Sequence, residues 1–239
     1  MIERIENVNG FDLWEKRDLF TVRILALLKS YGCKYQFATF YRQVIDGKTT
    51  AILSKLDNDF TLSVTDGFDN EELVRFFCVT GYNSILSSSA FILSPRYDEG
   101  EIMESVVKRE PAVGKYEIDE YPKLMDLFNF VDYDEQDFKA WYVDISHRVR
   151  HKTAKAYTLN VDGTTISSGI LSSIIEGYSI LTAVRTEDAF RKMGYGSVLV
   201  SYICCDVKGT VYIMCDSEKN ERFYSKLGFT KTEKWRMYK

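Results

Sequence analysis

The sequence predicts an α+β protein in which a mixed, mostly antiparallel sheet is flanked by helices, with two such halves in tandem. Strong hairpin turns stand at Asp46-Gly47 and Asp162-Gly163, each between two stretches that alternate apolar and polar residues. After each hairpin come a third strand pattern, a helix pattern and another strand pattern, in the same order. Because the sequences of the halves do not visibly repeat, an ancient duplication is a hypothesis.

The first half contains two predicted helices and four predicted strands. Apolar residues recur at helical spacing before Gly32, and Asp69 stands where it can cap the start of a second helix that ends near Gly81. The predicted elements are a helix over residues 16–30, strands over 35–45, 49–56 and 60–65, a helix from 70 to about 80, and a strand over 83–87.

The second half follows residues 96–121, which the sequence predicts to be a connector because Pro111 and Gly114 interrupt it and little periodicity is present. We therefore expect a domain 1–115 and a domain 116–239. The predicted elements of the second domain are helices over 121–130, 135–150, 196–207 and 218–227, and strands over 156–161, 165–175, 178–184, 210–215 and 230–238.

Composition excludes several classes of protein. The 239 residues carry 31 basic and 35 acidic side chains, a net charge of −4, which argues against a nucleic-acid binder. The N-terminus is charged from its third residue, and no apolar run is long enough for a leader or a membrane span. Five cysteines show no metal-ligand spacing and suit reduced thiols in the cytoplasm. The adjacent Cys204 and Cys205 are interpreted as a half-buried helical pair, because neighbouring helix residues point about 100° apart.

The most informative stretch is FRKMGYGS, residues 190–197, between a strand pattern and a helix pattern. Two glycines one residue apart allow a tight turn whose amides lie close to a ligand, and the following helix adds its positive end. Arg191 and Lys192 add charge, but no lysine follows the last glycine as in a P-loop, and the spacing of a dinucleotide-binding loop is absent. We expect a pyrophosphate as the ligand.

An acidic stretch and a pair of histidines can each be interpreted structurally or functionally. Residues 98–137 are rich in Asp and Glu, which suits a solvated surface or, alternatively, a field that attracts a cationic amine. His147 and His151 stand one helical turn apart, but no third metal ligand accompanies them, and a basic helix end is the simpler interpretation. No metal site is predicted.

The second half resembles the GNAT N-acetyltransferases. Residues 184–196, VRTEDAFRKMGYG, are similar to motif A of this family, which has Arg or Gln, two residues, Gly, one residue, then Gly or Ala. Residues 223–229, FYSKLGF, are similar to motif B, at the expected distance and between strands as expected. The resemblance covers about residues 157–238, a third of the chain, and implies the acyl-CoA N-acyltransferase fold.

This resemblance implies that acetyl-CoA lies between the strand ending at Val184 and the strand 210–215. The residues implied to contact the pantetheine arm and the acyl carbonyl are Leu181, Thr182, Ala183 and Val184. Those implied at the pyrophosphate are Arg191, Lys192, Met193, Gly194, Tyr195, Gly196 and Ser197. Phe223 and Asn220 are further cofactor candidates, although Phe223 also suits the core face of its helix and Asn220 a solvated position. Glu187 and Asp188 depart from the pattern, because carboxylates repel a phosphate unless they point outward.

Tyr224 is the residue implied to protonate the departing CoA thiolate after an amine attacks the thioester directly. The general base is left open among Glu176, Tyr178, Thr182 and Asp216. Helices before the first strands lie near the acceptor in such folds, which points to Trp141, Tyr142 and His147.

The expected function is N-acetyltransfer, or transfer of another acyl group, from acetyl-CoA to a primary amine whose identity the sequence does not reveal. The alternative is an inactive acyl-CoA-binding or protein-interaction module. The first half has no counterpart of the glycine turn between Asp66 and Asn70, so we expect a degenerate copy that either shapes the acceptor cleft or provides a homodimer surface.

Overall fold

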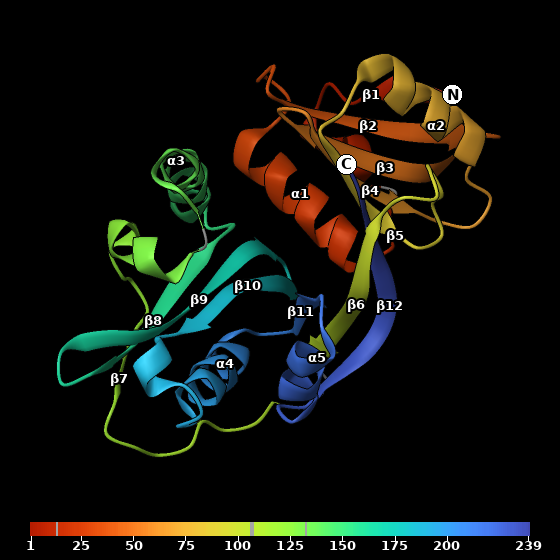
Figure 1. Ribbon diagram of the computed structural model, residues 1–239. Coiled ribbons are helices and arrows are strands. Elements are labelled where there is room, and N and C mark those ends of the chain that lie inside the picture. Colours follow the sequence, from red (N-terminus) through yellow and green to blue (C-terminus); the bar gives the residue numbers. More distant parts are fainter. Residues whose placement is uncertain (13, 106–107, 132) are drawn as a thin grey trace. The chain divides into compact units, whose positions relative to one another are not determined.

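The computed structural model describes residues 1–12, 14–105, 108–131 and 133–239. The predicted α+β class, with helices flanking a mostly antiparallel sheet, is confirmed (Figure 1). Close contacts divide the chain into two compact units. Unit 1 comprises Met1–Ile102, Met214–Ser217 and Lys231–Lys239, and unit 2 comprises Met103–Ile213 and Glu218–Thr230.

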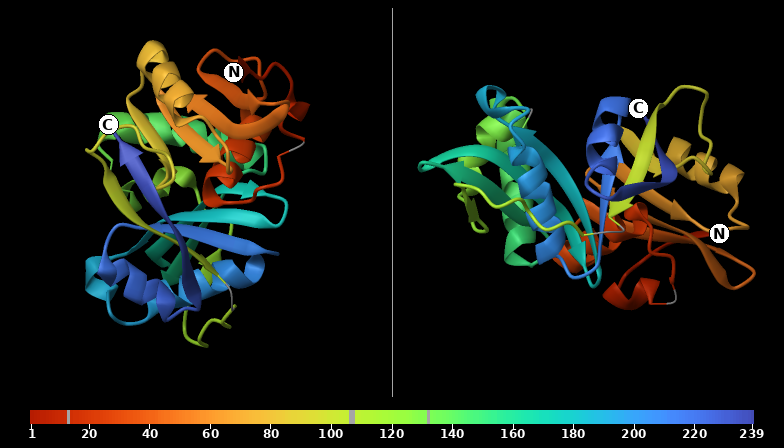
Figure 2. Two further views of the ribbon diagram at one scale, coloured as in Figure 1. Left: turned by 90° about the vertical axis from the view of Figure 1, so that its right-hand side faces the viewer. Right: turned by 90° about the horizontal axis from the view of Figure 1, so that it is seen from below.

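Unit 1 is built on strands in the order β1-β2-β3-β4-β5-β12. Neighbours run antiparallel except β4 and β5, which pair in parallel. Its elements are β1 (Ile2–Arg4), a 3-10 turn (Val8–Phe11), α1 (Leu19–Tyr31), β2 (Ala38–Ile45), β3 (Lys48–Leu56), β4 (Asp59–Val64), α2 (Asn70–Thr80), β5 (Ser84–Ser88) and most of β12 (Phe229–Tyr238). Both ends of the chain therefore lie in this unit (Figure 2).

Two helices cover opposite faces of the unit 1 sheet. Ile52 of β3 packs in a buried cluster with Ile24 of α1, whereas the adjacent Leu53 packs with Phe77 of α2. Successive residues of a strand point to opposite faces, so one strand serves both helices. The predicted hairpin at Asp46 is present, and Asp46 and Gly47 have the positive φ angles, 49° and 74°, that such turns require.

Unit 2 has strands in the order β11-β10-β9-β8-β7. The pairs are antiparallel except β10 and β11, which run in parallel. Its elements are β7 (Glu117–Asp119), the 3-10 helix η2 (Leu124–Phe130), α3 (Glu135–Arg150), β8 (Lys155–Val161), β9 (Thr164–Ile175), β10 (Tyr178–Thr186), a 3-10 turn (Asp188–Phe190), α4 (Tyr195–Asp206), most of β11 (Thr210–Cys215) and α5 (Glu218–Ser225). Strand β6 (Asp98–Ser105) has residues in both units.

The unit 2 sheet is also covered on both faces, by α3 and η2 on one side and by α4 on the other (Figure 1). Ile170 of β9 packs with Phe138 and Ile145 of α3. The adjacent Gly169 lies so close to α4 that a Cβ there would come within 2.9 Å of Ile203. Each unit thus has a helix, an antiparallel three-stranded meander, a helix on the other face and a parallel strand, and this shared order matches the prediction.

The predicted connector 96–121 contains two strands, β6 and β7, which is a correction. Strand β6 has little apolar periodicity, but its Glu99 pairs with Lys234 at 3.1 Å and its Glu101 with Lys231 at 3.6 Å on β12. Cross-strand charge pairs therefore support it where apolar alternation does not.

Two further boundaries differ from the prediction. The helix expected over 121–130 is the shorter 3-10 helix η2, and Lys123 at its start gives no side-chain cap. Residues Lys231–Lys239, expected with the second domain, pack in unit 1. Within the described ranges, no helix is long and apolar enough to cross a membrane.

Candidate active site

Strand β10 has a bulge where the resemblance places the acyl group. Thr182 pairs with Ile170 and Arg185 with Ser168, so Ala183 and Val184 together face the single residue Gly169 on β9. Ala183 has φ +50°, an uncommon value for a residue with a side chain. A bulge takes backbone groups out of the regular ladder, and bulges are frequent beside active sites. The backbone at Ala183 and Val184 can therefore bind a ligand.

On its other edge, β10 pairs with β11 only over a short length. The register joins Tyr178–Ile180 to Thr210–Tyr212, although β10 continues to Thr186. From Leu181 onward, β10 therefore stays paired with β9 on one edge, whereas its described pairing with β11 on the other edge has ended. A backbone segment of this kind fits a ligand that pairs as an added strand.

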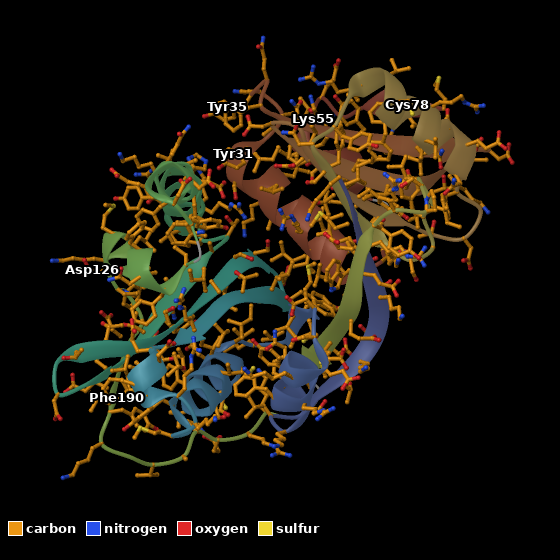
Figure 3. All side chains as sticks on the ribbon, viewed as in Figure 1. Tyr31, Tyr35, Lys55, Cys78, Asp126 and Phe190 are labelled. Atoms are coloured by element: carbon orange, nitrogen blue, oxygen red, sulfur yellow. The ribbon has the colours of Figure 1, made fainter. Side chains whose placement is uncertain are left out.

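The glycine turn leads into a helix start without a side-chain cap. Gly194 occupies the cap position of α4 with φ +92° and, having no side chain, gives the first turn no side-chain cap. The first-turn amides of a helix have no partner within it, and they attract anions. The first turn of α4 also has no acidic residue. Phe190, labelled in Figure 3, lies in this turn with its ring centroid 6.2 Å from that of Tyr195.

The corresponding helix start in unit 1 is closed to anions. Asp69 caps α2 by accepting a hydrogen bond from the amide of Glu72 at 3.0 Å, and Glu71 and Glu72 lie in the first turn. These carboxylates already satisfy the positive helix end and repel phosphate. The two units therefore share their order of elements but differ in the chemistry of this turn.

The charged residues of the glycine turn form one exposed ion pair. Arg191 Nη2 lies 2.7 Å from Asp188 Oδ1, and Arg191 Nε donates to the carbonyl of Thr186 at 3.2 Å. Asp188 thus neutralises the arginine of the turn. Lys192 and Met193 are exposed beside it.

Helix α5 brings the second motif to the same turn. A Cβ on Gly196 would lie 3.8 Å from the Phe223 ring and 3.0 Å from Thr186 Oγ1. Tyr224 is half-buried, with ring centroids 4.9 Å from Phe223 and 5.4 Å from Phe229. The Phe223 ring therefore lies beside Gly196 of the glycine turn, and Tyr224 follows it on α5.

The remaining predicted site residues differ in exposure. Leu181 is buried, Tyr195, Gly196 and Ser197 are partly buried, and Asn220 is exposed on α5.

A pocket of about 400 Å³ lies at the bulge. Its aromatic and apolar wall comes from η2, the segment leading to α3 and α3 itself, and consists of Phe130, Val131, Tyr133 and Trp141. Its opposite wall is β10, through Thr182, Ala183, Val184 and Arg185, and Arg191 of the glycine turn completes it. The bulge and the glycine turn therefore share one cavity of a size that suits a small ligand.

This pocket brings together Thr182, Ala183, Val184 and Arg191 from the predicted set, with Trp141 from the expected acceptor side. Tyr142 and His147, also expected there, do not line it. Sequence reasoning missed Phe130, Tyr133 and Arg185. Arg185 could have been predicted as a site residue, because it directly follows the end of the predicted strand 178–184. No sequence pattern indicates that η2 packs against β10.

The two histidines stack on each other rather than forming part of a metal site. Their ring centroids are 4.1 Å apart, and His151 Nδ1 lies 2.9 Å from the carbonyl of His147. Among the residues that the structure describes, no group of three or more His, Cys, Asp or Glu side chains could hold a metal. In the cysteine pair, burial raises the pKa of Cys204 to about 12, whereas Cys205 is half-buried.

A polar network fixes α4 to the sheet. Lys155 of β8 contacts Glu120 at 2.7 Å and Asp206 at 2.9 Å, and the hydroxyl of the fully buried Tyr157 donates to Asp206 at 2.7 Å. Burial and the bond to Asp206 raise the pKa of Tyr157, so this phenol stays protonated. Burial alone would lower the pKa of Lys155, but its carboxylate partners raise it. The network holds the helix whose start forms the glycine turn.

Comparison with known proteins agrees with this geometry. Residues 169–238 match the family of FR47-like proteins. A GCN5-related N-acetyltransferase from Kribbella flavida superposes with a TM-score of 0.59 at 12% identity, over 92% of this chain and 93% of that one. A GNAT-family acetyltransferase from Colwellia psychrerythraea gives 0.58 at 9% identity, over 99% and 98%.

A tandem GNAT protein from the clavulanic acid biosynthesis pathway gives a TM-score of 0.57 at 10% identity, over 99% of this chain and 97% of that one. The search of curated proteins found no match. The chain therefore has the fold of the GCN5-related N-acetyltransferases over nearly its whole length, and its residues 169–238 are similar to the FR47-like proteins.

Proposed function

We propose that the protein transfers an acetyl or other acyl group from its CoA thioester to a primary amine by direct attack within a ternary complex. The observation that carries this proposal is the continuity of one cavity. A bulged segment of β10, able to bind an acyl carbonyl, lines the same pocket as Arg191 of the glycine turn. The similarity to FR47-like proteins and the GNAT fold support an acyltransferase class.

The residues present fit acetyl-CoA, which supplies the activated acyl thioester when bound. The uncapped start of α4, with Gly194 in a left-handed conformation, offers the amides of residues 193–197 to a pyrophosphate. The backbone of Leu181–Val184 would hold the pantetheine arm, and the bulge at Ala183 and Val184 would leave backbone groups for the acyl carbonyl. Unit 1, whose α2 start is capped by Asp69, binds no CoA.

Tyr224 donates the proton that the departing sulfur takes up, and what supports this role is its position on α5 next to Phe223, whose ring lies beside Gly196 of the glycine turn. The proposal predicts that Tyr224→Phe lowers kcat at least about tenfold, since positioned acids contribute that much or more. The affinity for CoA, measured by calorimetry, should change less than about threefold, because the lost hydroxyl acts on the leaving group.

The control is Tyr121→Phe, which removes the hydroxyl of a tyrosine that is 84% exposed in the same unit and lines no part of the pocket. Its kcat should equal that of the wild type. CoA release is measured as free thiol over a panel of amines. If Tyr224→Phe turns over at the wild-type rate, Tyr224 is not the acid. If CoA binds but no amine releases thiol, the protein is an acyl-CoA-binding module.

A further inference from the structure

We propose that the acceptor is an aromatic amino acid or a close relative, a small amine that also carries a carboxylate and a planar apolar group. This inference rests on the proposed function and names the substrate class of the same site. Two properties of the pocket support it: an aromatic wall, and a guanidinium beside the bulge to which the described part of the chain gives no ion pair.

The aromatic wall offers rigid, partly open ring faces. Trp141 is half-buried, and its ring centroid lies 5.3 Å from Phe138 and 6.3 Å from Tyr133, which is itself 46% exposed. Phe130 adds a third ring to the lining. Aromatic side chains held by their neighbours favour a planar apolar ligand, because ring pairs gain energy beyond the burial of area. The wall therefore suits the aromatic part of an acceptor.

Arg185 supplies the complementary charge. Its side chain is half-buried, and the described part of the chain gives it no ion pair, whereas Arg191 on the same pocket is paired with Asp188. A guanidinium recognises a carboxylate through two parallel hydrogen bonds. Arg185 directly follows Val184 of the bulge. In an α-amino acid a single carbon separates the amine from the carboxylate, so a carboxylate at Arg185 keeps the amine close to the acyl position.

The lining disfavours a cationic acceptor. Its described residues carry two guanidinium groups and no carboxylate, although the sequence of residues 98–137 had suggested an acidic field that attracts amines. A polyamine or a lysine side chain would be repelled by Arg185.

The reaction balances without a further reactant. The amine nitrogen forms a bond to the acyl carbon, the bond from that carbon to sulfur breaks, and the products are the N-acyl amino acid and CoA. The substrate ammonium loses two protons overall, of which one ends on the CoA sulfur and the other in solvent.

The test compares L-phenylalanine with phenylalaninamide, phenethylamine, L-alanine and spermidine as acceptors for acetyl-CoA. Phenylalanine should have the highest kcat/KM, at least about tenfold above phenylalaninamide, as expected for the loss of a hydrogen-bonded charge pair. Arg185→Gln should abolish this preference for the acid over the amide. Trp141→Leu should reduce the preference for phenylalanine over alanine.

The matched control is Arg150→Gln, which removes the same charge from an exposed position at the end of α3. It should leave the preference for the acid intact. A spermidine rate equal to that of phenylalanine, or an Arg185→Gln variant whose KM rises for acetyl-CoA and not for the amino acid, would overturn the inference but leave the proposed function standing.

If no amine releases thiol, the proposed function fails, and binding decides the inference. Calorimetry then compares phenylalanine with phenylalaninamide in the presence of CoA. Tighter binding of the acid that depends on Arg185 supports the inference, and equal or absent binding of both overturns it.

Discussion

At the scale of single residues, the proposed function predicts that Asp188 competes with phosphate for Arg191. The two form an ion pair at 2.7 Å in which Asp188 is 82% and Arg191 53% exposed, so the pair itself contributes little to stability. We expect Asp188→Asn to leave folding unchanged and to tighten CoA binding about two- to fivefold, because it frees the guanidinium and removes a repelling charge. Calorimetry measures the affinity.

The control for this prediction is Glu218→Gln. Glu218 is also exposed and pairs with Arg222 at 2.6 Å, four residues along α5. It should leave the affinity for CoA unchanged. Weaker binding in Asp188→Asn would mean that Asp188 orients Arg191 for the ligand instead of masking it.

Glu233 is a second residue with an unusual charge state, in unit 1. Burial, and after it the nearby Asp18, raise its pKa from 4.5 to about 7 against the opposite effect of Lys16. The folded protein therefore keeps this proton to a higher pH than the unfolded chain, and the free energy of unfolding falls as pH rises from about 4.5 to about 7. Above that window the loss is complete.

Glu233→Gln mimics the protonated form and should remove this loss. We expect its Tm to exceed that of the wild type by about 2–4 °C at pH 8, a gain of about 1 kcal/mol for a partly exposed group, and to equal it at pH 4.5. Thermal unfolding followed by circular dichroism at both pH values is the measurement. The exposed Glu6→Gln serves as control. A Tm gain of equal size at both pH values would show that ionisation of Glu233 is not the cause.

At the scale of elements, the proposed function makes the start of α4 the feature that distinguishes the CoA-binding unit from the other. Gly194→Asp would place a carboxylate at the cap of α4, where Asp69 stands in α2. The change should strain the backbone, because Gly194 has φ +92°, but it causes no clash, since no atom lies within 4 Å of a Cβ there, and aspartate adopts left-handed backbone more readily than most residues. The carboxylate would satisfy the first-turn amides and repel phosphate, so CoA affinity should fall at least about tenfold.

Gly67→Asp tests the same substitution where no ligand is expected. Gly67 also has a positive φ, 81°, and open space around its Cβ, in the turn that precedes α2. It should leave CoA binding unchanged. Equal loss of affinity in both variants would show that the effect of Gly194→Asp comes from general destabilisation.

Most elements follow from local patterns, but those that shape the pocket do not. The hairpins, α3 and the glycine turn are set by turn residues, apolar spacing and caps, which the sequence displays. Strand β6 depends on charge pairs with β12, far away in the chain. The bulge at Ala183 depends on its pairing with β9. Arg185 lines the pocket because of this tertiary pairing, so the set of site residues predicted on this strand ended at Val184.

At the scale of the whole molecule, the chain's last strand completes the sheet of its first unit. Strand β12 pairs with β5 from Trp235 to Tyr238, and Tyr238 is buried in the same cluster as Phe77 of α2 and Phe91. Its hydroxyl donates to the carbonyl of Phe91 at 2.8 Å. Residues 223–229, which resemble motif B, are thus followed within a few residues by a strand that packs in the core of unit 1.

We therefore expect Tyr238→Ala to destabilise unit 1 by about 3–5 kcal/mol, the usual cost of removing a buried aromatic side chain. Amide hydrogen exchange should accelerate in α2 and β5, which pack against this side chain, and change less in α3 and β9 of unit 2. Lys239→Ala, an exposed neighbour, is the control and should exchange like the wild type. Uniform acceleration across both units would instead mean that the units unfold together, because local opening confined to one cooperative region leaves the other protected.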